Sequence, residues 1–128
     1  MSENEIAKVV VDAAYRVHVT LGPGLLESVY EVALEYELKK RGLKAVRQRG
    51  LPVVYDAIVI DEGYRADLVV EDKVILELKS VEEIVPVHKK QLLTYLRLAN
   101  MRLGLLINFG DALIKHGITR VVNGLEES

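Results

Sequence analysis

The spacing of apolar residues changes at Leu43, from the period of helices to the period of strands. Before that point apolar residues recur every three or four positions in two segments, which predicts two amphipathic helices. The first begins at the capping-box pair of Ser2 and Glu5, and the second runs from about residue 25 to residue 41, with Gly42 as its C-terminal cap. The predicted buried stripe of the second helix is Leu26, Val29, Tyr30, Ala33, Leu34 and Leu38.

After Leu43 the chain consists of short β-rich runs separated by turn residues. Pro86 is expected to open a third helix, residues 102–109 form a buried strand, and residues 118–122 form a last short one. This order predicts a mixed α/β (α+β) arrangement around one sheet, in a single domain over residues 1–128. The other predicted strands are residues 45–49, 53–55, 58–60, 64–70 and 74–79, with turns at Asp56, residues 61–63 and residues 71–73.

Charge and cysteine content restrict which nucleic-acid-binding and metal-binding sites the chain can form. The 17 basic and 19 acidic residues give a net charge of −2, which is not that of a protein that coats nucleic acid. Residues 39–49 nevertheless hold six basic residues and no acid, either as a local phosphate-binding patch or as a solvated helix end. The chain has no cysteine, so any metal must be held by oxygen or imidazole ligands.

The N-terminal residues are acidic, and the apolar residues that follow them are periodic, which is unlike a signal peptide. No apolar run approaches the roughly 20 residues of a membrane span. We therefore expect a soluble, cytoplasmic protein without a membrane partner.

The predicted hairpin from Tyr64 to Lys79 carries the candidate chemistry. If residues 71–73 form a three-residue loop, Asp67 lies directly opposite Glu77, and Lys79 projects from the same face. Two facing carboxylates in an apolar setting repel each other, and a hard cation relieves that repulsion. Mg²⁺ favours one or two carboxylates together with water and phosphate.

A second interpretation stays open on spacing alone. Asp67 and Glu77 can be solvent-facing strand residues, each paired with a nearby lysine or arginine. A loop of two or four residues would place them on opposite faces and remove the geometric argument.

The motif resembles a known superfamily. Asp67, followed after nine residues by Glu77-Leu78-Lys79, resembles the D…ExK signature of the PD-(D/E)XK phosphodiesterases, although Ala66 stands where the motif has proline. Residues 24–30, Gly-Leu-Leu-Glu-Ser-Val-Tyr, are similar to the motif that names the GxxExxY protein family, a branch of that superfamily. Further blocks similar to that family are residues 21–24, 64–68, 91–96 and 104–110.

This resemblance implies a restriction-endonuclease-like core, a central mixed sheet of about four strands flanked by helices. It implies a nuclease that hydrolyses nucleic acid by metal-activated water with Mg²⁺ or Mn²⁺, with DNA favoured over RNA as substrate. A homodimer would let two sites act on two strands. The alternative is a non-catalytic module that keeps the nuclease fold and binds nucleic acid or protein.

By the same resemblance, Asp67 and Glu77 bind the metal, and the backbone carbonyl of Leu78 is a further metal ligand. Lys79 orients or helps to deprotonate the attacking water and stabilises charge on the phosphate.

Three more residues acquire roles from the resemblance. Glu27 is the extra carboxylate beside the metal, although from its position alone it reads as a first-turn helix acid. Gln91 and Tyr95 resemble the QxxxY element of RecB-like nucleases. Their spacing of four places them on one helical face, where they would position the substrate backbone or the lysine. His88, three residues before Gln91, and His18, before the glycine loop, are lesser candidates for the site.

Overall fold

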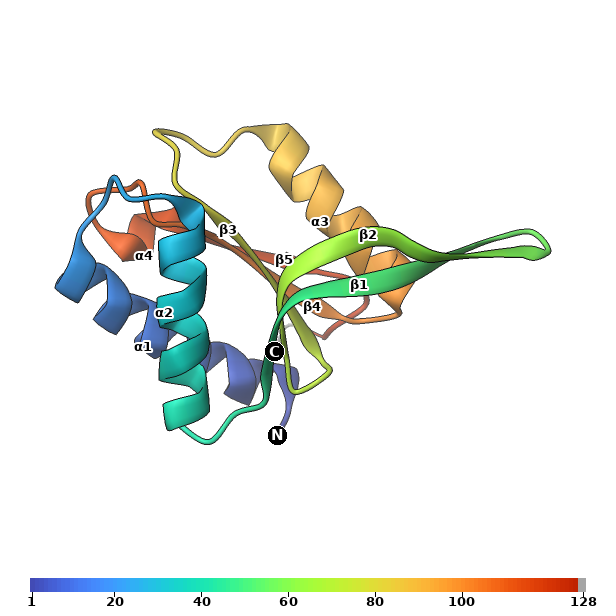
Figure 1. The fold of residues 1–128 in the computed structure, drawn as a ribbon, viewed down its shortest axis with the longest axis horizontal. Coiled ribbons are helices and arrows are strands. Elements are labelled where there is room, and N and C mark those ends of the chain that lie inside the picture. The colour runs from blue at the N-terminus through green and yellow to red at the C-terminus, as the bar shows by residue number, and fades with distance from the viewer. Residues whose placement is uncertain (127–128) are drawn as a thin grey trace.

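The structure is a computed structural model, and it describes residues 1–126. Its centre is a five-stranded mixed sheet with helices on both faces (Figure 1). Helices α1 (Glu3–Leu21), α2 (Glu27–Lys40) and the short α4 (Ile114–Gly117) cover one face, and α3 (Pro86–Ala99) covers the other. The predicted mixed sheet between helices is confirmed, with one strand more than the four expected.

The strands lie in the sheet in chain order. All neighbouring pairs are antiparallel except β3 and β4, which are parallel and are joined through α3. A parallel pair needs such a long crossover, whereas antiparallel neighbours need only a turn. The strands are β1 (Ala45–Tyr55), β2 (Ile58–Val70), β3 (Val74–Lys79), β4 (Leu103–Asn108) and β5 (Ile118–Val122).

The predicted turn at residues 61–63 is wrong, because β2 runs through it. Four of the predicted short strands merge into the two long strands β1 and β2. The turn-like composition marks a shift of register instead: Leu51 pairs with Tyr64, but Val53 pairs with Ile60, so extra residues of β2 bulge opposite Pro52. Proline and glycine suit a β-bulge as well as a turn, and composition does not distinguish the two.

Helix α1 buries one apolar face, as expected of an amphipathic helix, but the stripe predicted for α2 is only partly right. Tyr30, Leu34 and Leu38 of α2 are fully buried, whereas Leu26 is 75% exposed and Val29 is 40% exposed. The helix is apolar on two sides, and only one side meets the sheet. No helix in residues 1–126 is long and apolar enough to cross a membrane.

Tyr30 fastens the loop between α1 and α2 to the core. Its hydroxyl donates to the carbonyl of Gly22 at 2.5 Å and accepts from the N–H of Leu25 at 3.0 Å. Its ring stacks on Phe109, which directly follows β4, with centroids 4.5 Å apart. Leu25 in turn accepts a hydrogen bond from the Ser80 hydroxyl at 2.7 Å, so the start of α2 is held at the carboxyl end of β3.

We expect Tyr30→Phe to lower the free energy of unfolding by about 0.5–1.5 kcal/mol, because two part-buried hydrogen bonds to the loop are lost. Urea denaturation measures this change. Tyr36→Phe is the matched control on the same helix, because Tyr36 is 66% exposed, and its effect should stay within about 0.5 kcal/mol. Equal effects of the two substitutions would contradict the role given to the Tyr30 hydroxyl.

Candidate active site

The hairpin of β2 and β3 has the register that the sequence argument required. Val70 pairs with Val74 and Leu68 pairs with Leu76, so residues 71–73 form a three-residue loop. Beyond Leu68 the backbone pairing gives way to a side-chain contact. The carboxylate of Asp67 accepts a hydrogen bond from the N–H of Leu78 at 2.8 Å. Asp67 is therefore bound directly to the strand that carries Glu77.

An irregularity in β2 aims Asp67 at β3. Ala66 lies in the apolar core under α3, and Leu68 lies in the core on the opposite face, although residues two apart in a regular strand share a face. Pairing with β1 is also interrupted here, and Gln48, opposite Asp67, has a left-handed φ of 50°. The strand thus changes face at Asp67, as strands do at bulges beside active sites.

Glu77 is a buried acid in the centre of the sheet. It is 9% exposed, and its Oε1 atom is buried without a hydrogen-bond partner. Burial, followed by the neighbouring Asp67 carboxyl, raises the pKa of Glu77 to about 9, while Lys79 acts in the opposite direction. Such an orphaned, desolvated oxygen next to a second carboxylate is a fit for a divalent cation, which would favour the ionised form.

Lys79 ends β3, two residues after Glu77, and it is half-buried. Its backbone is fixed at the carboxyl end of the parallel pair, because Lys79 pairs with Asn108 and its carbonyl accepts from the N–H of Phe109 at 2.8 Å. The Lys79 side chain therefore projects from the same face as Glu77, and its backbone is held by β4.

Helix α3 supplies the two polar residues predicted for one helical face. Burial raises the pKa of Tyr95, and the nearby carboxyls of Glu77 and Asp67 raise it further, while a hydrogen bond from Gln91 opposes the shift. Tyr95 is thus close enough to both acids to sense their charge, and Gln91 lies against its hydroxyl.

Tyr64 belongs to the same cluster and was missed by sequence reasoning. Its ring stacks on Tyr95 with centroids 4.3 Å apart, and its hydroxyl donates to the carbonyl of Tyr95 at 2.8 Å. Burial is the main cause that raises the pKa of Tyr64 to about 12, with smaller contributions from Tyr95 and Glu77. The available signal was its position three residues before Asp67, on the side of β2 that faces α3.

Asn108 is a second residue without a predicted role. It is fully buried, and its amide donates to the carbonyl of Val81 at 2.9 Å and to Asp111 at 3.0 Å. Its oxygen accepts from the N–H groups of Val81 and Gly110, both at 3.0 Å. Gly110 has no room for a side chain, because a Cβ atom there would lie 2.1 Å from the Val81 carbonyl oxygen. These four hydrogen bonds fix the loop that follows Lys79.

Glu27 is not brought into contact with the acid pair. It is exposed in the first turn of α2, and α2 packs on the face of the sheet opposite α3. The start of α2 is connected to the end of β3 only through the hydrogen bond that Ser80 donates to Leu25, among the contacts described. Among residues 1–126, no group of three or more histidine, cysteine, aspartate or glutamate side chains is placed to hold a metal ion. Glu27 as a third carboxylate and the Leu78 carbonyl as a ligand stay predictions.

The two histidines of interest have structural contacts. The Nε2 atom of His18 lies 2.8 Å from the carbonyl oxygen of Asp111, which ties α1 to the loop after β4. The Nδ1 atom of His88 accepts from the N–H of Val85 at 3.3 Å, at the start of α3. Neither contact reaches Asp67 or Glu77.

The basic run at residues 39–49 is largely neutralised by carboxylates from elsewhere in the chain. The half-buried pair of Arg47 with the buried Glu31 of α2 anchors it to the fold. The interpretation as a continuous phosphate-binding patch loses its support, since most of these cations already have partners. The other pairs are Lys39 with Glu35, Arg41 with Asp12 and Glu37, and Lys44 and Arg49 with Asp72.

A family model described as the PD-(D/E)XK nuclease superfamily matches residues 4–121, nearly the whole chain. No curated protein and no solved structure matches. The superfamily suggested by the motif is confirmed, and its GxxExxY branch stays a prediction.

The raised pKa of Glu77 predicts a pH dependence of the metal-free protein. In the unfolded chain Glu77 releases its proton near the ordinary value of 4.5, and in the folded chain near about 9. The unfolded state therefore binds fewer protons between these values, and the stabilisation present below about pH 4.5 is lost as the pH rises toward 9. Thermal melts in EDTA should show a Tm that falls over this range.

Glu77→Gln should flatten that fall, because the amide does not ionise. Glu83→Gln, at an exposed position after the same strand, is the control and should follow the wild type. If wild type and Glu77→Gln keep parallel Tm profiles, Glu77 does not hold its proton in the folded state.

Proposed function

The chain belongs to the PD-(D/E)XK nuclease superfamily, and we propose that it is a metal-dependent nuclease that hydrolyses phosphodiester bonds in nucleic acid. The observation that carries the proposal is the pair of acids on β2 and β3, in which the buried Glu77 has an oxygen without a partner beside Asp67. Lys79 follows on the same strand. A nuclease needs acids for a cation and a fixed positive charge for the phosphate, and these three residues supply both.

The residues fit Mg²⁺ or Mn²⁺, which in this superfamily serve as the usual divalent cofactors. Asp67 and Glu77 would hold the ion, and the family resemblance adds the Leu78 carbonyl and Glu27. When bound, the ion would polarise the phosphate and lower the pKa of a water molecule. With two carboxylates, the site leaves room for water and phosphate oxygens, as Mg²⁺ prefers.

Other residues of the chain would neutralise charge on the phosphate, orient the attacking water and position the substrate. Lys79 would neutralise charge that develops on the phosphate and orient the attacking water, because its backbone is fixed by β4. Gln91 and Tyr95 would hold the substrate backbone, and the half-buried Tyr64 keeps the Tyr95 ring in place through stacking. A positioned group of this kind acts by reducing reorganisation in the transition state.

We propose DNA as the preferred substrate, and a homodimer that presents two sites to two strands. The balanced basic run argues against a long electrostatic track along a duplex, so recognition would rest on the immediate surroundings of the site. The alternative, a module that binds nucleic acid or protein without cleaving it, is separated from the proposal by the cleavage assay.

The first test is cleavage of single- and double-stranded DNA and RNA with Mg²⁺ or Mn²⁺, by the wild type and by Asp67→Asn. Asp67→Asn should reduce cleavage by about 10³-fold, a loss of the size seen for a single electrostatic group. Its Tm should be unchanged, because the amide oxygen can still accept from the N–H of Leu78.

EDTA should abolish wild-type cleavage, and the control Glu83→Gln, exposed after β3, should cleave normally. Activity that survives in Asp67→Asn would mean that the site is misplaced. Silence of a folded, metal-binding wild type on all four substrates would favour the non-catalytic module.

Lys79→Ala should separate turnover from metal binding. We expect kcat to fall by about 10²–10³-fold while the Mn²⁺ dissociation constant, measured by calorimetry, changes little, because the lysine acts on the phosphate. Lys8→Ala, exposed on α1, serves as control. A parallel loss of metal affinity would show that Lys79 supports the acids and not the phosphate.

A further inference from the structure

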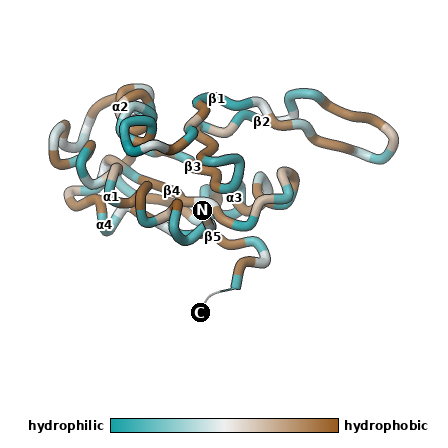
Figure 2. Tube along the Cα trace, turned by 90° about the horizontal axis from the view of Figure 1, so that it is seen from below, coloured by the Kyte–Doolittle hydropathy of each residue, from teal (hydrophilic) through white to brown (hydrophobic). Residues whose placement is uncertain are grey.

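The outer part of the β1–β2 hairpin, residues 53–63, projects from the body as a two-stranded arm (Figure 1). Pairing of β2 with β3 ends at Leu68, and within residues 1–126 no third strand extends along the arm. Figure 2 shows hydrophobic residues along it. The apolar side chains exposed on the arm are Val54 (65%), Tyr55 (71%), Ile58 (57%), Val59 (62%) and Ile60 (45%).

A two-stranded ribbon is marginally stable in water on its own, and a contiguous exposed apolar surface on a protein marks a contact site. The charge of the arm restricts what can cover it. Asp56, Asp61 and Glu62 lie in the arm, which has no basic residue. Glu62 pairs with Arg65 next to the arm, so Asp56 and Asp61 supply its net negative charge. Nucleic acid and anionic membranes would repel it, and two arms packed on each other would bring like charges together. The complementary surface is therefore apolar and basic.

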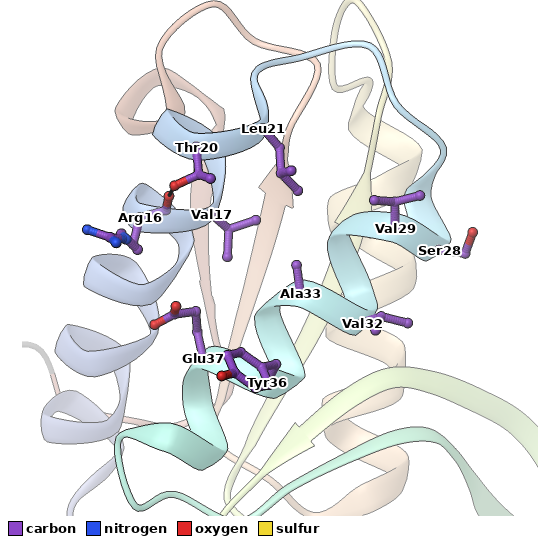
Figure 3. Close-up of a pocket in the computed structure, with 10 residues that line it drawn as sticks. All are labelled: Arg16, Val17, Thr20, Leu21, Ser28, Val29, Val32, Ala33, Tyr36 and Glu37. Carbon is purple, nitrogen blue, oxygen red and sulfur yellow. Dashed lines mark hydrogen bonds between the residues drawn. The ribbon is translucent and has the colours of Figure 1, made fainter.

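This chain has such a surface on its other side, in the groove between α1 and α2 (Figure 3). The groove has a volume of about 750 Å³, and Val17 and Leu21 of α1 point into it toward Ala33 of α2. Its α2 side is the apolar face that the sheet leaves uncovered, with Val32 49% and Tyr36 66% exposed.

One end of the groove is basic. Arg16 and Glu37 line both the groove and an adjoining cavity, and that cavity is completed by Lys40 and Arg41. Three cations lie at this end with two carboxylates, because Arg41 pairs with both Glu37 and Asp12. A net charge of +1 therefore remains where an acidic arm would end. The apolar part of the groove matches the aliphatic residues of the arm, and the basic end matches its acids.

We propose that the arm of one copy of this chain occupies the α1–α2 groove of a second copy. The arm projects at the end of the molecule opposite α1 and α2 (Figure 1), so a two-fold axis perpendicular to the arm lets both arms dock and closes the assembly. A standard interface of about 1,600 Å² then divides into two contacts of about 800 Å² each. Val54 and Val59 lie on one face of the arm, and Tyr55, Ile58 and Ile60 lie on the other, so an arm inserted between α1 and α2 presents apolar side chains to both helices.

This interface specifies which surfaces form the homodimer of the proposed function. It does not rest on nuclease activity, and its test reads mass instead of cleavage, so either proposal can fail alone.

The test is the mass of the full chain by light scattering and sedimentation equilibrium, from about 1 to about 100 µM. The wild type should have twice the chain mass of 14.3 kDa. Val59→Glu on the arm and Val32→Glu in the groove should each weaken the dimer by about a hundredfold, because each charge enters both contacts of the pair.

Val19→Glu is the matched control, since Val19 is as exposed as Val59, at 62%, and lies outside both surfaces; this variant should stay dimeric. Mixing Val59→Glu with Val32→Glu should restore part of the dimer, because one intact arm then meets one intact groove. A monomeric wild type at about 100 µM, growth beyond a dimer, or a dimer insensitive to Val32→Glu would each overturn the proposal. Circular dichroism of each variant verifies folding.

Discussion

The hydrogen bond from the Leu78 N–H to the Asp67 carboxylate is the contact on which the candidate site depends. Backbone pairing between β2 and β3 ends at Leu68, and from there the side chain of Asp67 joins the strands. The bond uses one carboxylate oxygen of Asp67 and holds this carboxylate next to Glu77. Because Asp67 is reached through a change of face in β2, the bulged strand is a condition of the site and not a defect beside it.

The site is costly for the metal-free fold. Glu77 has a buried oxygen without a partner, and the neighbouring acid adds repulsion. The surrounding structure offsets this cost with rigidity, since β3 is paired on both sides and Asn108 fixes the loop after it through four hydrogen bonds. A destabilising pair of buried acids within a structure that is otherwise well hydrogen-bonded is typical of a functional site.

The parts that sequence predicted correctly depend on local rules. The three-residue loop at residues 71–73 sets the register of the hairpin, and this register places Asp67 beside Glu77 on the neighbouring strand. The missed parts depend on distant partners: Arg47 is neutralised by Glu31 of another element, and Tyr64 acquires its place from Tyr95 of α3. The bulge at Pro52 was missed because the same residues form turns. None of these outcomes is encoded in spacing along one segment.

One strand connects the two surfaces of interest. β2 carries the arm at one end and Asp67 near the other, and Tyr64 packs against Tyr95 between them. An arm held by a second copy would therefore fix the orientation of the strand that presents the acid. Two-fold symmetry would in addition relate the two acid pairs by a half-turn, and the two backbones of a duplex are related by the same operation. The arm thus gives a physical reason why a small domain with a balanced charge could act on paired strands without a long basic track.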